Sequence, residues 1–292
     1  MKRSGELRIG ISGWRYAGWR GKFYPKGLPH RRELEYASGV FNSVEINGSF
    51  YSLQRPSSYQ RWYSETPDDF LFAVKGGRFI THMKKLRNVE VPLANFFASG
   101  VLTLREKLGP ILWQLPPNLA CNEQRLSEFF ELLPRNMCEA ASLGKKHDNK
   151  LKTRAWTRID ISRRIRYAIE VRHDSFMTPE FFALLRKYKI AFVFADTAGK
   201  FPYAEDLTAD FIYIRLHGAT ELYVSGYSEK ALQCWADRIE HWRKGKHPRD
   251  AKLITRARKA AKQLDVFVYF DNDAKVHAPF DAQRLAARLG LA

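Results

Sequence analysis

The chain has 292 residues, of which 45% are hydrophobic and 27% charged, and its formal net charge at pH 7 is +18. A chain of this size can fill one large core, and no run approaches the roughly 18 apolar residues of a membrane-spanning helix. The short polar start is not typical of a signal peptide, and three widely spaced cysteines suit neither a disulfide framework nor a CxxC metal site. We therefore expect a cytoplasmic protein that forms one domain over residues 1–292.

Short apolar runs, most of them followed by helix-like sequence, alternate along the whole chain. The expected strands are Leu7–Ser12, Ser43–Asn47, Phe70–Lys75, Pro110–Leu115, Arg166–His173, Ala191–Asp196, Phe211–His217 and Val266–Asn272. The expected helices are Arg31–Gly39, Pro56–Glu65, Val91–Lys107, Asn122–Leu133, Thr178–Tyr188, Ser228–Lys244 and Pro279–Leu289. Continuous apolar runs are typical of parallel strands that are covered on both faces. This order predicts a single α/β domain, a TIM-type (β/α)8 barrel.

Almost every expected strand ends on polar or charged residues. Carboxylates come from Glu45, Glu170, Asp196 and Asp271, cations from Lys75, Arg172 and Arg215, imidazoles from His173 and His217, and amides from Asn47, Gln114 and Asn272. In a parallel barrel the C-terminal ends of the strands form one rim, and active sites lie at that rim. The pattern therefore predicts where the chemistry occurs.

Acid/base or electrostatic catalysis is the first interpretation of this rim. Crowded carboxylates and histidines shift each other's pKa values, which provides an acid and a base near neutral pH. We expect Glu170 and His217 to be the acid/base pair, supported by Glu45. Asp196 and Asp271 would orient groups or bind a metal. The set of Lys75, Arg172 and Arg215 would clamp an anionic group, with arginine offering a bidentate fork.

Two other interpretations of the same residues remain open. Glu170, Asp196, His217 and Asp271 offer oxygen and nitrogen ligands that suit a divalent ion such as Mg²⁺, Mn²⁺ or Zn²⁺, although neighbouring arginine and lysine side chains would repel it. Alternatively, the charges form a structural salt-bridge network that closes the barrel without turnover. No P-loop, GxGxxG, HExxH or Ser-His-Asp motif is present.

Aromatic residues follow the first two expected strands. Trp14, Tyr16 and Tyr51 lie in these loops and would stack a sugar or a base beside the charged rim. The alternative is that they form only the small core of their own loops.

Most of the positive charge belongs to two stretches of the chain. Residues 142–166 hold nine Lys/Arg against two Asp, and residues 243–262 hold nine Lys/Arg against one Asp. Such basic stretches attract nucleic acid through its phosphates, or they are solvated loops that aid solubility. Both precede an expected strand, so we expect them on the N-terminal face of the barrel, opposite the rim.

Several segments resemble the YecE-like family, also called domain of unknown function 72. They include "IGISGWRYAGWRGKFYP", "FNSVEINGSFYSL", "FLFAVKGGRFITHMKKL", "YAIEVRHDSF", "DFIYIRLHGATELYVSGYS" and "VFVYFDNDAKVHAPFDA", and the resemblance extends from Leu7 to Ala282. It implies a TIM-type barrel and implies no particular activity. The basic segment "KKHDNKLKTRAW" at 145–156 and the basic stretch before the last strand indicate a longer branch of the family.

Taken together, the sequence predicts an enzyme, a hydrolase, lyase or isomerase, acting at the rim on a small anionic or sugar-like substrate. A nucleic-acid-associated protein or metal-dependent nuclease is the alternative that the basic stretches favour. A non-catalytic ligand-binding barrel is the third.

Overall fold

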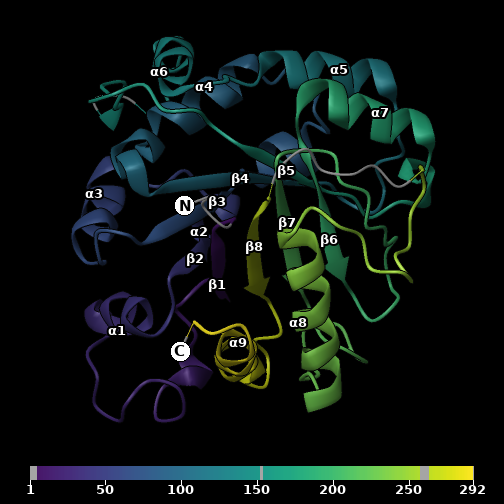
Figure 1. The fold of residues 1–292 in the computed structure, drawn as a ribbon. Coiled ribbons are helices and arrows are strands. Elements are labelled where there is room, and N and C mark those ends of the chain that lie inside the picture. Colours follow the sequence, from purple (N-terminus) through teal and green to yellow (C-terminus); the bar gives the residue numbers. More distant parts are fainter. Residues whose placement is uncertain (1–4, 152–153, 257–262, 292) are drawn as a thin grey trace.

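A closed parallel barrel is the centre of the computed structural model, which describes residues 5–151, 154–256 and 263–291 (Figure 1). Within these residues, eight strands pair side by side in chain order and β8 closes onto β1. Helices surround the strands on the outside. The predicted TIM-type barrel is confirmed.

The strands and helices alternate along the chain. The strands are β1 Leu7–Ser12, β2 Ser43–Ile46, β3 Leu71–Lys75, β4 Leu108–Gln114, β5 Tyr167–Glu170, β6 Ala191–Asp196, β7 Phe211–Leu216 and β8 Asp265–Phe270. The α-helices are α1 Glu33–Val40, α2 Gly48–Tyr51, α3 Pro56–Ser64, α4 Glu90–Ala98, α5 Glu123–Leu132, α6 Met137–Gly144, α7 Pro179–Tyr188, α8 Glu229–Arg243 and α9 His277–Arg288. A π-helical turn, η3 (Phe79–Met83), follows β3, and a 3-10 segment, η4 (Val101–Lys107), precedes β4.

Alternation along each strand decides which side chains enter the barrel. Ala73, Leu112 and Tyr213 belong to the inner cluster, whereas their neighbours along the strands pack outward against the helices. Because side chains two residues apart share a face, the inward register continues from Ala73 to Lys75 and from Tyr213 to Arg215. The interior is therefore apolar in its middle and charged at the C-terminal rim.

The opposite end of the barrel is closed by Arg166. Its guanidinium lies over the rings of Phe211 and Phe267, at 5.2 and 4.8 Å from their centroids, and donates to Asp265 at 2.7 Å. The N-terminal end of the barrel is thus closed by stacked side chains. The polar side chains gather at the other end, the C-terminal rim.

The expected helix Val91–Lys107 is interrupted, which corrects the sequence prediction. Helix α4 ends at Ala98, and Gly100 adopts a φ of 120° where a Cβ would lie 2.5 Å from Pro56 Cα. Only glycine tolerates this close approach. The chain then continues as η4, in which Arg105 has a φ of 51° and a ψ of −125°.

The first basic stretch does not lie wholly on the N-terminal face, contrary to expectation. Lys150 Nζ lies 4.7 Å from the centroid of Phe79, and Lys146 donates to Glu90 at 2.8 Å, so residues 146–150 reach segments that follow β3 at the rim. Helix α6, which the sequence did not predict, carries the chain there. Residues 152–153 of this stretch lie outside the described residues.

The described part of the second basic stretch lies toward the N-terminal end, as expected. Arg243 donates to the backbone oxygen of Gly5, just before β1, and Thr255 donates to Asp206, on the segment that leads into β7. The expected contribution of residues 257–262 lies outside the described residues. Among the helices of the described chain, none combines the length and hydropathy that a membrane crossing requires.

Gly10 provides a test of the barrel geometry. It faces inward on β1, and an added Cβ would lie 1.8 Å from the backbone oxygen of Ser43 on β2. The added Cβ would meet the backbone of a paired strand, which cannot move aside as a flexible side chain could. Gly10→Ala should therefore lower the free energy of unfolding by about 3 kcal/mol or more, measured by urea denaturation. Gly18→Ala is the matched control, since no atom lies within 4 Å of its added Cβ. Equal stability of the two variants would contradict this strand register.

Candidate functional site

Arg215, which is completely buried near the end of β7, lies at the centre of the rim. Its Nε and Nη2 donate to the two carboxylate oxygens of Glu45 at 3.1 and 2.8 Å. Nη1 donates to Glu170 at 2.7 Å, and Nη2 donates to Asp271 at 2.8 Å. Three carboxylates from β2, β5 and the end of β8 therefore converge on one guanidinium.

Glu45 is fully engaged by further donors. Tyr213 donates its hydroxyl to Oε2 at 2.6 Å, and Ser12 Oγ donates to Oε1. Asn47 in turn donates to Ser12 Oγ at 2.7 Å. Saturated with hydrogen bonds and buried, Glu45 serves as a fixed counter-charge for Arg215 and leaves no lone pair for a substrate.

Glu170 and Asp271 are held as carboxylates. Burial alone would raise the pKa of Glu170, but Arg172 and Arg215 outweigh it and hold that pKa well below the ordinary value. Burial would also raise the pKa of Asp271, but Arg215 and His217 outweigh this effect, and the pKa of Asp271 is lowered. His217 lies with Nδ1 at 3.1 Å from Asp271 and Nε2 at 3.6 Å from Glu170. Neither carboxylate can supply a proton near neutral pH.

Lys75 is the cation of the rim that lacks a protein acceptor. Its side chain is inward and the residue is only 7% exposed, and within the described residues its ammonium forms neither a hydrogen bond nor an ion pair. Nζ lies 4.3 Å from the centroid of Phe50. Burial, followed by the charge of Arg215, lowers the pKa of Lys75 to about 8.

Other cations surround Lys75. Arg172 donates to Glu170 and to the hydroxyl of Tyr223, each at 2.8 Å. Burial, followed by the charges of Lys75, Arg172 and Arg78, lowers the pKa of His82 to about 4. The contributions of these three cations, which add to that of burial, indicate a positive potential at the outer part of the rim, which favours an anion there.

Asp273 is a rim carboxylate that the sequence interpretation missed. Burial, reinforced by the negative charge of Asp271, raises the pKa of Asp273 to about 6. It is two residues beyond Asp271 and partly exposed, so it can exchange a proton near neutral pH. Its position directly after a strand of the barrel, in the run Asp271-Asn272-Asp273, was a usable signal, since residues that follow β8 lie at the rim.

The predicted aromatic residues line one cavity beside the rim. Trp14, Tyr16 and Tyr51 contribute to its walls, together with Asn47, and its volume is about 330 Å³, within the range of small-molecule sites. The Oδ1 atom of Asn47 is buried without a hydrogen-bond donor among the described residues. Planar aromatic walls beside a polar amide suit the binding of a hydroxylated ring.

Three predicted residues lie outside the cluster, because they have the opposite register. Asp196 points away from the barrel axis and accepts from Tyr227 at 3.1 Å. His173 accepts from the backbone of Ser175 at 3.2 Å, and Asn272 donates to Asp281 at 2.8 Å. These side chains hold loops and helices in place. Gln114 pairs in register with Glu170 and is buried on the inward face.

The residues proposed for a divalent metal do not fit one. Asp196 lies on the other side of its strand, and Arg215 occupies the space between Glu170 and Asp271. Among the described residues, no group of three or more His, Cys, Asp or Glu side chains is arranged to hold a metal ion.

Sequence comparisons connect the chain with proteins of unknown function. The family model "Protein of unknown function DUF72" matches residues 8–292. UPF0759 protein YecE of Escherichia coli K12 is 31% identical over 129 residues, which are 44% of each chain. UPF0759 protein YunF of Bacillus subtilis is 28% identical over 129 residues, 41% of this chain and 44% of that protein. The matches thus span less than half the length of these curated relatives.

Solved structures agree with the fold. The crystal structure of a DUF72 family protein from Thermotoga maritima has a TM-score of 0.73 at 24% identity, covering 98% of this chain and 99% of that one. A DUF72 family protein from Enterococcus faecalis has a TM-score of 0.68 at 16% identity, covering 98% and 96%. At these identities the likeness concerns the fold alone.

Lys75→Met should make the protein more stable. Holding a buried ammonium whose pKa is about 8 instead of the ordinary 10.5 destabilises the fold by roughly 3 kcal/mol at pH 7. The unfolded chain binds more protons between these two values, so wild-type stability should rise as the pH increases from about 8 to 10.5. The variant should gain up to about 3 kcal/mol in free energy of unfolding at pH 7 and lose this rise.

Lys107→Met is the matched control for this measurement. Lys107 is also buried, but it donates to the backbone oxygens of Tyr63 and Thr66, each at 2.8 Å. Its replacement removes both hydrogen bonds, leaves the buried backbone oxygen of Thr66 without this donor, and should lower stability. Chemical denaturation at several pH values measures both variants, and a loss of stability in Lys75→Met would contradict the absence of a protein partner.

Proposed function

Since the chain belongs to the DUF72 family of proteins of unknown function, we propose from its own rim that it is an enzyme acting on a small anionic, sugar-like substrate. The reaction is acid/base chemistry of the hydrolase, lyase or isomerase type. The substrate's anionic group binds at Lys75, and its ring lies in the cavity of Trp14, Tyr16 and Tyr51.

The observation that carries this proposal is the ammonium of Lys75, which has no hydrogen-bond acceptor or ion-pair partner among the described residues and lies against the ring of Phe50. A buried charge without a partner is unfavourable, and such groups concentrate at functional sites. The remaining charges of the rim already satisfy one another, so structure alone does not require a further cation there. An anionic substrate would supply the hydrogen-bond acceptor that the ammonium of Lys75 lacks among the described residues.

Under this proposal, the anion is bound by Lys75 and Arg172, without the expected contribution of Arg215. Arg215 is fully engaged by Glu45, Glu170 and Asp271 and has no donor left to offer. Lys75 therefore binds the anion, and Arg172 assists from the edge, where it is paired but not enclosed. Arg215 has the role of positioning the rim.

Proton transfer belongs to Asp273 in this proposal, in place of the expected Glu170. A carboxyl whose pKa is about 6 is poised to accept or give a proton near neutral pH. Glu170 stays ionised between two arginines. His217 contacts both Glu170 and Asp271 and orients them.

We place this activity in the cytoplasm. The three cysteines, Cys121, Cys138 and Cys234, are all free thiols, as a reducing compartment maintains them. The alternative function is that of a non-catalytic binding barrel. Such a protein would bind the same compounds without turnover, so a turnover measurement distinguishes the two.

The test is binding and turnover of a panel of sugar phosphates and sugar acids, followed by NMR. At least one compound should bind and be converted, with affinity that decreases above about pH 8 as Lys75 loses its proton. Lys75→Met should weaken binding by about tenfold or more, since a charge-assisted hydrogen bond contributes roughly 1.5–3 kcal/mol. Asp273→Asn should preserve binding and abolish turnover.

Lys187→Met is the control, because Lys187 is exposed near the end of α7, on the connection that leads into the start of β6 opposite the rim. If Lys75→Met bound the panel as tightly as the wild type does, the assignment of Lys75 as the anion-binding residue would be wrong. Binding without conversion by the wild type would contradict catalysis and identify a binding protein.

A further inference from the structure

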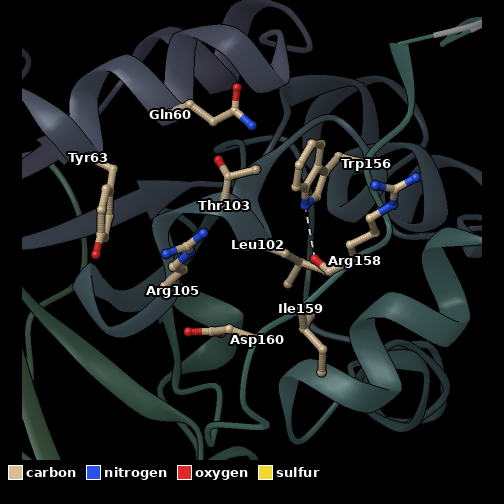
Figure 2. A pocket seen from close by; sticks show the side chains of 9 residues that line it. All are labelled: Gln60, Tyr63, Leu102, Thr103, Arg105, Trp156, Arg158, Ile159 and Asp160. Atoms are coloured by element: carbon tan, nitrogen blue, oxygen red, sulfur yellow. Dashed lines mark hydrogen bonds between the residues drawn. The ribbon is translucent and has the colours of Figure 1, made fainter.

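A second pocket, outside the barrel, lies between helix α3, the η4 segment and residues 156–160 of the first basic stretch (Figure 2). Its volume is 310 Å³, within the range of small-molecule sites. Figure 2 shows Tyr63 and Arg105 on one side of the pocket and Trp156 and Arg158 on the other. None of these residues takes part in the rim described above.

Two arginines at this pocket have no carboxylate partner. Among the described residues, neither Arg105 nor Arg158 forms an ion pair, although both line the pocket. The nearby acids are already neutralised, because Arg163 forms ion pairs with Asp160 at 2.7 Å and with Glu106 at 3.5 Å. Arg105 lies over the ring of Tyr63 and Arg158 over that of Trp156, with guanidinium carbons 5.5 and 5.9 Å from the ring centroids. The pocket therefore presents two cations that no carboxylate of the described residues neutralises.

The backbone of Arg105 is strained. Its φ of 51° and ψ of −125° belong to a region that glycine occupies readily and other residues rarely do. Such conformations persist at binding sites where a particular side chain is needed. Glycine would adopt this conformation without strain, whereas arginine at this position places a guanidinium at the pocket.

An aromatic ring and polar groups complete the pocket. Trp156 is held in place by its own Nε1, which donates to the backbone oxygen of Arg158 at 2.9 Å. Gln60 lines the opposite side and forms no side-chain hydrogen bond with the described residues. A fixed indole ring stacks a planar base, an amide can pair with the edge of that base, and arginine forks bind phosphate.

We propose that this pocket binds a nucleotide unit, with its base against Trp156 and its phosphate between Arg105 and Arg158. The unit comes either from a free nucleotide or from one residue of a single-stranded nucleic acid. The second source is consistent with the other basic residues that the structure describes in the first basic stretch, such as Lys150 and Arg154, which can bind further phosphates of a nucleic-acid strand. This inference is independent of the substrate proposed for the rim.

Fluorescence titration and NMR with full-length protein test the proposal, using AMP, UMP, adenosine, inorganic phosphate and the oligonucleotides dT10 and rU10. AMP should bind more tightly than adenosine or phosphate, since both halves of the pocket are then occupied. Binding of the oligonucleotides that is tighter than that of mononucleotides and falls steeply with salt identifies a strand as the source. Mononucleotide binding without that gain identifies a free nucleotide.

Arg105→Gly is the decisive variant. It should lose about tenfold or more in nucleotide affinity, the effect of removing one charge-assisted contact. Its melting temperature should be equal to or higher than that of the wild type, because glycine relieves the strained backbone. Trp156→Ala should weaken binding and Trp156→Phe should restore part of it.

Arg31→Ala is the control for net charge, since Arg31 is exposed and forms no ion pair among the described residues. Lys75→Met should bind nucleotides as the wild type does, which separates this pocket from the rim. Absence of binding by all probes, or undiminished binding by Arg105→Gly, would overturn the proposal.

Discussion

The ion pairs of Arg215 with Glu45, Glu170 and Asp271 are the interaction on which the rest of the rim depends. Removing one partner of a buried ion pair typically destabilises a protein by about 3–5 kcal/mol, because the remaining charge is left uncompensated. Here one guanidinium bridges three strands that are far apart in sequence. The pairs therefore fix both the protonation of the carboxylates and the relative positions of the strand ends.

This arrangement determines what the remaining groups can do. Because the three carboxylates already face Arg215, they give Lys75 no hydrogen-bond partner, and burial with the charge of Arg215 lowers its pKa to about 8. The fixed charge of Asp271 acts in the opposite sense on Asp273 and helps to raise the pKa of that carboxyl to about 6. A single structural network thus produces one unpartnered cation and one titratable acid at the same rim.

Much of this could be predicted from sequence, because the barrel follows from local patterns. Continuous apolar runs such as Val266–Phe270 indicated parallel strands, and polar residues at their ends indicated the rim. Period two correctly grouped Glu170 with Arg172 and Arg215 with His217. The same rule, applied to Asp196 and to Asn272, would have excluded both, since each follows an inward residue directly.

Other features depend on long-range contacts that sequence patterns do not encode. Whether Arg215 binds a substrate or Glu45 depends on how β2 and β7 face each other across the barrel. The break before η4 depends on Pro56 approaching Gly100. The course of the first basic stretch toward Phe79 depends on α6, whose short length gave little periodicity to detect.

The pKa of Lys75 in the wild-type protein is the most direct test of this account. Competitive acetylation followed by mass spectrometry measures it as a function of pH, with the exposed Lys22 as an internal reference. The account predicts a midpoint near 8 for Lys75. A midpoint at or above the ordinary value of 10.5 would mean that a carboxylate of the rim is paired with Lys75, and would contradict the assignment of all three to Arg215.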